Sequence, residues 1–395
     1  MSALGEIAGV TAMNLRAVPQ RASASAVAVV GIAGVVLIIV AVLSVAQGFR
    51  RTLELAGSDR VAIVLRGNST AEMESLFQED QVRIIEGTPG IARGAHGPVV
   101  SAELFTTADQ PKRSTGGPAN APLRGIEPGG VLTREHFQLV AGRMFTPGRY
   151  EVIVGRQAAH TLSGLDVGRT AHWGNIDWQV VGQFSDGGSV AESEVWTDAR
   201  VLQGAYSRGD SFQTVRVLLP SAASFASFKD ELTHDPRLDV SVYTERQFYA
   251  EQASMIAAVV RGAGTVLALL MGVGAVFGAL NTMYSAVAAR STEIATLRAL
   301  GFGASAVVIS VIVEALLLAL IGGALGAAGA YLAFDGFETS TLNYASFSQV
   351  SFAFAVTPAL IAGGVGYALL LGFVGGLFPA IRAARLPIIE GLREG

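Results

Sequence analysis

The chain has no cysteine, only two lysines and five histidines among its 395 residues. The missing cysteines exclude disulfide bonds, thiol catalysis and cysteine-ligated metal sites, so any folded part must be stabilised by its own core. A phosphate-binding loop needs Gly-Lys followed by Ser or Thr, whereas Lys112 and Lys229 follow Pro and Phe. The sequence therefore carries no nucleotide-hydrolysing site of that type.

Other catalytic motifs are also missing. No Gly-x-Ser-x-Gly or His-Glu-x-x-His string occurs, and the histidines are scattered at positions 96, 136, 160, 172 and 234. The formal net charge is -4, and the basic residues are dispersed, which is not the pattern of a nucleic-acid-binding surface. We therefore expect a non-catalytic chain with no metal or cofactor of its own and no nucleic-acid partner.

The composition is that of a membrane protein, since 51% of the residues are hydrophobic and only 15% are charged. Crossing the hydrocarbon core takes about 20 apolar residues in a helix. Four segments are long enough, and we predict transmembrane helices at 24–48, 253–284, 306–334 and 356–380. The first is interpreted as a retained anchor rather than a signal peptide, because signal peptides have apolar regions of only about 7 to 15 residues.

The arginines indicate the orientation, since short loops rich in Lys and Arg stay in the cytoplasm. Seven arginines lie on one side of the spans, at Arg16, Arg21, Arg290, Arg298, Arg382, Arg385 and Arg393, and the loop 335–355 has no basic residue. Arg50 and Arg51 lie on the other side, but they begin a long domain, where the rule has little force. We therefore predict that segments 1–23, 285–305 and 381–395 are cytoplasmic. The large insert 49–252 and the loop 335–355 are predicted to be external.

The insert alternates short β-type runs with Gly and Pro, as expected for a water-soluble α+β domain. Strands are predicted at Val61–Leu65, Val99–Leu104, Glu151–Val154, Trp178–Phe184, Val195–Thr197, Thr214–Leu219 and Val240–Tyr243, with a hairpin turn at Gly174-Asn175. Helices are predicted at Ser69–Phe77, Gln157–Ser163 and Ala222–Leu232. The fold class is thus four transmembrane helices with an α+β domain inserted between the first and the second.

Two further features of the insert concern its ends and one loop. Phe49–Leu55 and Glu245–Val260 continue helical patterns out of the first span and into the second, and neither has the composition of a flexible linker. We expect them to form helical stalks. The segment Lys112–Pro122 is rich in turn residues and is predicted to be an exposed loop, either a plain connection or a partner-binding tip.

A short charged helix is predicted between the second and third spans. Ile294, Leu297 and Leu300 recur at every third residue and mark an apolar face, and Gly301 is placed to end the helix. Such a helix could lie on the membrane surface or could dock into a cytoplasmic ATPase. For the second reading, the candidate coupling residues are Arg290, Glu293, Ile294, Leu297, Arg298 and Gly301.

Glu314 lies within the third span, where a carboxylate is costly and needs a partner or a function. It lies about two helical turns from the cytoplasmic end, so it could reach the interface or pair with Arg298. We favour that structural role over a proton or substrate site. Small-residue pairs at Gly274/Gly278, Gly322/Gly326 and Gly372/Gly376 predict close helix packing, within one subunit or between two.

These motifs resemble those of ABC transporter permeases of the FtsX-like or MacB-like family. The resemblance is carried by Arg290-x-x-Glu293-Ile294-Ala295-x-Leu297-Arg298-Ala299-Leu300-Gly301 and by Pro379-Ala380-x-Arg382-Ala383-Ala384-Arg385-x-Pro387. In the insert, Gly142-Arg143-x-Phe145, Glu151-Val152-Ile153-Val154-Gly155, Leu165-x-Val167-Gly168 and Val180-Val181-Gly182 look like the periplasmic core domain of that family. The similarity spans nearly the whole chain.

The resemblance implies a bacterial inner-membrane permease that works as a dimer with a second copy or a paralogue. It also implies a separate ABC ATP-binding subunit that holds ATP and Mg, and a membrane-fusion protein is a further partner that fits. The expected function is to couple ATP hydrolysis to movement of the external domain, for export or extraction of a lipid, lipoprotein, peptide or drug. The alternatives are a non-transporting relay that regulates a cell-wall hydrolase or sensor and, less favoured, a membrane-anchored ectoenzyme.

Overall fold

The computed structural model describes residues 7, 9–13, 22–55, 57–343 and 348–389. The chain divides into two compact units. The membrane unit comprises Met1–Gln47, Ala257–Phe337 and Phe354–Gly395, and the sheet domain comprises Gly48–Ile256 and Glu338–Ala353.

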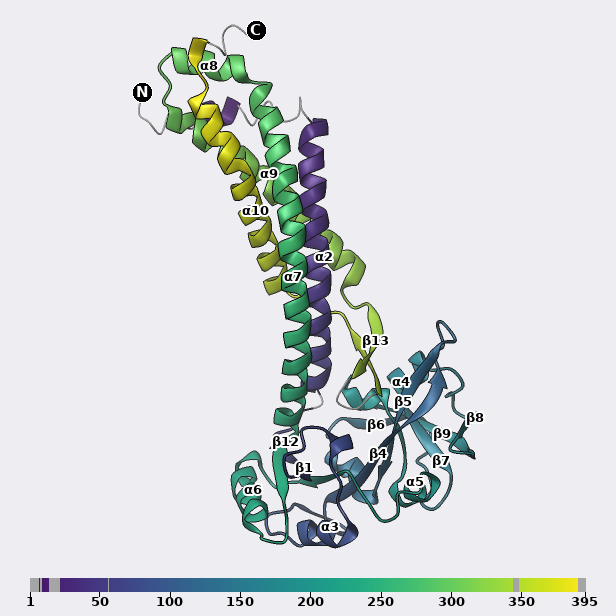
Figure 1. The fold of residues 1–395 in the computed structure, drawn as a ribbon. Coiled ribbons are helices and arrows are strands. Elements are labelled where there is room, and N and C mark those ends of the chain that lie inside the picture. Colours follow the sequence, from purple (N-terminus) through teal and green to yellow (C-terminus); the bar gives the residue numbers. More distant parts are fainter. Residues whose placement is uncertain (1–6, 8, 14–21, 56, 344–347, 390–395) are drawn as a thin grey trace. The chain divides into compact units, whose positions relative to one another are not determined.

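Within the described part of the chain, four helices are long and apolar enough to cross a membrane. They are α2 (Ala22–Leu55), α7 (Glu245–Ala288), α9 (Ala304–Phe334) and α10 (Pro358–Arg385), and the short helix α8 (Ser291–Ala299) connects α7 to α9 (Figure 1). The helix α10 begins in a typical way, with a proline in its first turn and Thr357 as the N-cap residue. The predicted fold class is confirmed, because the sheet domain lies in sequence between the first and second of these helices.

Small residues let the helices of the membrane unit pack closely. A Cβ atom at Gly322 would lie 2.8 Å from the carbonyl oxygen of Val29 in α2, and one at Gly376 would lie 2.6 Å from the Cβ atom of Ala315 in α9. Gly326 and Gly372 have similarly close neighbours, in α2 and α9 respectively. Gly274 and Gly278 differ, because a Cβ atom at either position would meet no described atom within 4 Å.

The sheet domain is built on a ten-stranded mixed sheet with the order β12-β1-β11-β4-β5-β10-β7-β9-β6, and β8 pairs with β9. The strands are β1 (Val61–Arg66), β4 (Val100–Pro111), β5 (Pro118–Ile126), β6 (Phe137–Gly142), β7 (Glu151–Gly155), β8 (Thr170–Trp173), β9 (Ile176–Asp186), β10 (Val195–Asp198), β11 (Thr214–Leu218) and β12 (Val240–Thr244). The pairs β5–β10 and β7–β9 are parallel, and the other pairs are antiparallel.

The long strand β4 joins two halves of this sheet. Its first residues, Val100–Glu103, pair with β11, and its later residues, Leu104–Pro111, pair with β5. Each half has its own apolar core, and α3 (Glu79–Glu86) and α6 (Phe225–His234) contribute to the first core. The helices α4 (Arg156–Thr161) and α5 (Ala199–Ala205) contribute to the second. We call the boundary between Glu103 and Leu104 the seam of the sheet.

The seven predicted strands are all present, as β1, β4, β7, β9, β10, β11 and β12. One helix prediction in the domain is wrong, and one loop prediction is wrong in part. The predicted helix Ser69–Phe77 is reduced to the short 3-10 helix η2 (Glu72–Glu74), and the predicted loop Lys112–Pro122 instead contributes Pro118–Pro122 to β5. This strand tolerates its prolines because both precede Leu123, where pairing with β10 begins, so they lie in a stretch of β5 that pairs with β4 alone. The remaining 3-10 helices are η3 (Pro128–Thr133), η4 (Val190–Ser193) and η5 (Ala222–Ser224).

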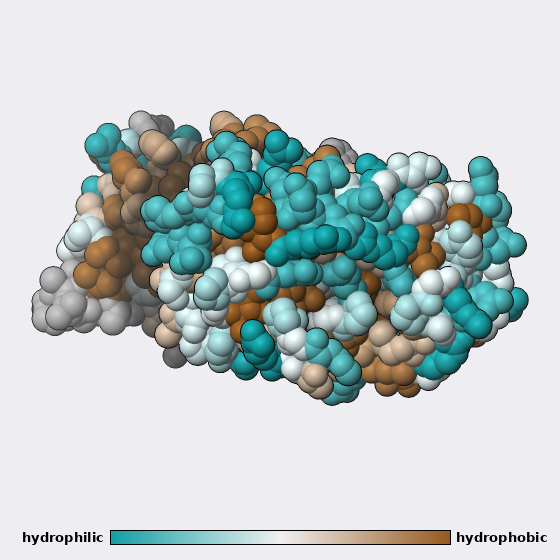
Figure 2. Space-filling view, turned by 90° about the horizontal axis from the view of Figure 1, so that it is seen from below, coloured by the Kyte–Doolittle hydropathy of each residue, from teal (hydrophilic) through white to brown (hydrophobic). Residues whose placement is uncertain are grey.

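The segment between α9 and α10, predicted to be an external loop, contains a β-hairpin that packs within the sheet domain. Its strands are β13 (Glu338–Asn343) and β14 (Ser348–Ala353). The backbone N–H of Ser351 donates to the hydroxyl of Ser193 at 3.0 Å, and the ring of Phe352 meets that of Phe49 edge-on at 5.6 Å. The domain face seen in Figure 2 is largely hydrophilic, as expected for a domain in water.

Candidate coupling site

The helix α8 is fixed at both ends by its neighbours in the sequence. Arg290 is its N-cap residue, two residues after the end of α7, and Gly303 is the N-cap residue of α9. Gly301 adopts a φ angle of +98°, a conformation that suits glycine and stops the helix after Leu300. Short connections of this kind make α8 a bridge between two membrane helices.

One face of α8 is packed, and the opposite face is left exposed by the residues that the structure describes. Ile294 and Ala295 are buried, and Ile294 lies in an apolar cluster with Met283, Val307 and Val311. Leu297 and Arg298 are half-buried, whereas Glu293, Thr296 and Leu300 are exposed. The exposed fraction of Leu300 reaches 72%. The helix therefore presents a mixed charged, polar and apolar surface outside the packed bundle.

The predicted apolar face of Ile294, Leu297 and Leu300 is thus split in the structure. Steps of three residues do not repeat on a helix with 3.6 residues per turn, so each step moves the side chain by about 60° around the axis. Ile294 faces the core, Leu297 lies at its edge and Leu300 points away. The spacing of the apolar residues correctly predicted a helix, but it did not predict which of these residues would be buried against the other helices.

A buried ion pair ties the start of α8 to α9. The Nη2 atom of Arg290 lies 2.5 and 2.7 Å from the two carboxylate oxygens of Glu314, and the side chains are only 5% and 4% exposed. The Nε atom of Arg290 is buried and has no hydrogen-bond partner among the described residues. Leaving one member of such a pair without the other typically costs about 3–5 kcal/mol.

Of the two possibilities that the sequence left open for Glu314, pairing with Arg298 is therefore wrong. Arg298 instead donates from Nη1 to the backbone carbonyl of Leu386 at 2.6 Å, just beyond the end of α10. Arg290 and Arg298 are eight residues apart, which is about 12 Å along a helix axis. The two arginines consequently contact different helices and connect α8 to both α9 and α10.

Sequence reasoning missed the buried charges of the sheet domain. Glu103, Arg124 and Arg216 lie on central strands and are almost fully buried. Their signal in the sequence is a single charge within an apolar strand, as in Thr-Val-Arg-Val-Leu at 214–218. Among the described residues, no three His, Asp or Glu side chains are grouped so that they could hold a metal ion.

Comparison with known proteins agrees with this architecture. Residues 25–235 match the MacB-like periplasmic core domain, and residues 265–388 match the FtsX-like permease C-terminal family. The chain is 24% identical to the uncharacterized ABC transporter permease YknZ of Bacillus subtilis, over 83% of this chain and 82% of the relative. It is 23% identical to the uncharacterized ABC transporter permease MJ1507 of Methanocaldococcus jannaschii, over 95% of each chain.

A solved structure of the periplasmic region of MacB from Actinobacillus actinomycetemcomitans aligns with a TM-score of 0.37 and 13% identity, over 48% of this chain and 91% of that one. The homologues are ABC transporter permeases, and the FtsX-like permease domain is non-catalytic, as the sequence predicted. A permease of this kind works with an ATP-binding subunit. The chain therefore belongs to the FtsX-like ABC transporter permeases with a MacB-like periplasmic core domain, and it is a multi-pass membrane protein.

Proposed function

We propose that this permease couples ATP hydrolysis by a separate ATPase subunit to movement of its sheet domain, for export or extraction of a lipid, lipoprotein, peptide or drug. ATP and Mg are held by the partner, and this chain receives the movement. The observation that carries the proposal is the position of α8, which is anchored on one face and exposed on the other.

The exposed face of α8 offers the contacts that a docking helix needs. Leu300 supplies an apolar side chain, and Glu293 supplies a charge that can select a complementary partner. The packed face holds α8 through Ile294 and the Arg290–Glu314 pair. A displacement of α8 by the ATPase would therefore pull on α9 and α10 rather than bend a loose loop.

The helix α7 provides the path to the sheet domain. It is continuous over 44 residues, from Glu245 in the sheet domain to Ala288, and Arg290 follows two residues later. At 1.5 Å per residue such a helix is about 66 Å long. We propose that its cytoplasmic end moves with α8 and that its first turn carries the movement into the domain.

The proposal places both chain termini and α8 in the cytoplasm of a bacterium and the sheet domain outside it. It also includes a second copy or a paralogue of the permease. The open positions at Gly274 and Gly278 on α7 support that arrangement, because small residues there leave room for a helix of another subunit. Exposed apolar side chains on the same helix, such as Val273 and Phe277, would be covered by that helix or by lipid.

The alternative is a relay that moves an external partner enzyme without passing cargo. It is favoured by the close packing of α2, α9 and α10 at Gly322, Gly326, Gly372 and Gly376, where any added side chain would collide with a neighbouring helix. Mechanical transmission suits such a bundle better than passage through it. This alternative would be supported if an external hydrolase showed ATP-dependent activity while no cargo moved.

The main proposal is tested by changing the free face of α8. Glu293→Arg and Leu300→Glu should reduce co-purification of the ATP-binding subunit, because they reverse a charge and remove an apolar contact without touching the packed face. Leu132→Glu serves as the matched control, since Leu132 is 58% exposed and lies in the sheet domain. If both α8 variants retain the subunit as well as the control does, α8 is not its docking site.

A further inference from the structure

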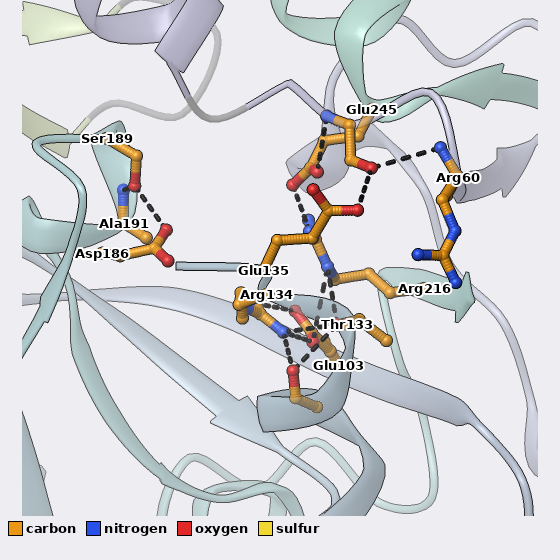
Figure 3. A network of polar contacts seen from close by, with 12 residues as sticks. Arg60, Glu103, Thr133, Arg134, Glu135, Asp186, Ser189, Ala191, Arg216 and Glu245 are labelled. Carbon is orange, nitrogen blue, oxygen red and sulfur yellow. Dashed lines mark hydrogen bonds and ion pairs between the residues drawn. The ribbon is translucent and has the colours of Figure 1, made fainter. Parts of the chain in front are cut away.

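Seven buried charged side chains meet inside the sheet domain, and none of them belongs to α8. Their side chains are at most 11% exposed. They are Glu72 in η2, Glu103 in β4, Arg124 in β5, Arg134 after η3, Glu194 before β10, Arg216 in β11 and Glu245 at the start of α7. We call this set the seam network. Figure 3 shows part of it, with Glu103, Arg134, Arg216 and Glu245 close together.

Glu103 is the shared acceptor of the seam network. Its two carboxylate oxygens accept from Arg134 at 2.6 and 2.9 Å, and Oε2 also accepts from Arg124 at 3.0 Å. Arg216 approaches the same carboxylate more loosely, with Nε 3.9 Å from Oε1. Although burial raises the pKa of Glu103, the surrounding arginines lower it to about 2. Glu103 is therefore ionised at neutral pH and attracts all three guanidinium groups.

Glu103 lies at the point where β4 changes its pairing partner. Glu103 is the last residue of β4 that pairs with β11, and Leu104 is the first that pairs with β5. Arg216 belongs to β11 on one side of the seam, and Arg124 belongs to β5 on the other. The network thus holds the two halves of the sheet together at the residue where β4 changes partners.

The stalk helix α7 enters the same network with its first residue. Glu245 pairs with Arg216 through a short contact between Oε1 and Nη2, and its Oε2 atom accepts from the backbone N–H of Ser58 at 3.1 Å. Ser58 follows closely after the end of α2. The first residue of α7 therefore also holds the chain at Ser58, three residues after the end of α2.

We propose that the Arg216–Glu245 pair is the joint through which movement of α7 reaches the seam of the sheet. Arg216 lies between two carboxylates, hydrogen-bonded to Glu245 and 3.9 Å from Glu103. When α7 withdraws Glu245, Arg216 shifts its pairing toward Glu103 and competes there with Arg134 and Arg124. An unpaired charge at this depth is strongly unfavourable, so the network exchanges partners instead of stretching. This inference rests on the proposed function.

Trp196 is a natural fluorophore that contacts two residues of the seam network. The indole Nε1 atom of Trp196 donates to Glu194 at 2.7 Å, and the guanidinium of Arg134 lies 4.6 Å from its ring centroid. Trp196 is fully buried, so its emission depends on these two charges rather than on solvent. The other two tryptophans, Trp173 and Trp178, lie in the second apolar core.

The test uses the full-length permease with its ATP-binding subunit in lipid nanodiscs. Tryptophan emission is recorded with and without a non-hydrolysable ATP analogue and Mg, and the Trp196→Phe variant gives the contribution of the other tryptophans. We expect the nucleotide to change the Trp196 signal in the unmodified protein. Glu245→Gln, which keeps the shape of the side chain but removes its charge, should reduce that change at least threefold while the subunit still binds.

Asp235→Asn is the matched control, because it neutralises the exposed Asp235–Arg237 pair of the same domain and should leave the signal unchanged. If Glu245→Gln lowers the yield of folded protein, Arg216→Lys is judged by the same criteria. The Arg216–Glu245 pair is not the joint if the folded variant shows the full nucleotide-induced change in Trp196 emission. The same holds if the unmodified protein shows no such change. The proposed function fails separately, if the ATP-binding subunit does not associate with the chain at all.

Discussion

The Arg290–Glu314 pair allows a quantitative test of how α8 is held. Glu314→Ala leaves the Arg290 guanidinium buried, with its Nη2 atom deprived of an acceptor that lies at 2.5 and 2.7 Å. Two unit charges about 4 Å apart attract by about 4 kcal/mol at an effective dielectric constant of 20. The measured cost of breaking buried pairs, about 3–5 kcal/mol, is of the same size.

We therefore expect the free energy of opening α8 locally to fall by about 3–5 kcal/mol in Glu314→Ala. Since about 1.4 kcal/mol corresponds to a tenfold change in an equilibrium constant, the hydrogen-bonded amides of residues 294–299 should exchange at least roughly 100-fold faster. Hydrogen exchange read by mass spectrometry measures this in detergent or nanodiscs. Peptides of the sheet domain provide the internal control.

A second variant separates the charge from the packing. Replacing both partners, as Arg290→Met with Glu314→Leu, removes the unpaired charge and fills the same space, so stability should return close to that of the unmodified protein. If the Arg290–Glu314 pair transmits movement, this double variant should still couple ATP hydrolysis poorly to movement of the sheet domain. Exchange in Glu314→Ala within threefold of the unmodified protein would refute the reasoning, because the pair would then contribute nothing to the position of α8.

Three further predictions follow from the structure. Gly326→Leu should prevent correct folding, because any side chain there collides with the backbone of α2, whereas Gly274→Leu should leave the monomer folded and weaken a dimer, as size-exclusion chromatography would show. The pKa of Glu103 is about 2 in the folded state, below the ordinary glutamate value of 4.5, so its contribution to stability is present above pH 4.5 and is lost as the pH falls toward 2; acid unfolding followed by tryptophan emission checks this. Because the chain has no native cysteine, a single cysteine can be introduced at Thr296 or at Ser227 and labelled on intact cells with a membrane-impermeant maleimide. Only the cysteine at Ser227 should react. Labelling at Thr296 would contradict the cytoplasmic placement of α8.

Much of the fold could be predicted because its signals are local. The four spans follow from the length of the apolar runs, and the strands follow from short β-branched segments between turn residues. The predicted helical stalks at both ends of the insert agree with the continuous helices α2 and α7. The strand β5 was not predicted, because its prolines and glycine are residue types typical of turns. Its strand conformation depends on pairing with β4.

The candidate site was predictable in part. The sequence placed a short helix between α7 and α9 and ended it at Gly301, since capping and turn residues act locally. It could not select Arg290 over Arg298 as the partner of Glu314, because that choice depends on how α8 is rotated against α9. For the same reason it could not show that Leu300 is free while Ile294 is covered.

The sequence by itself determined the number of membrane helices, the insertion of a sheet domain after the first of them, and the charged helix after the second. These depend on hydropathy, periodicity and capping, which act over a few neighbouring residues. Only the tertiary structure decided that Glu245 and Arg216 meet beside Glu103, because residues far apart in the chain must be brought together before their charges can compensate each other. The network at the seam therefore becomes visible only in the folded domain.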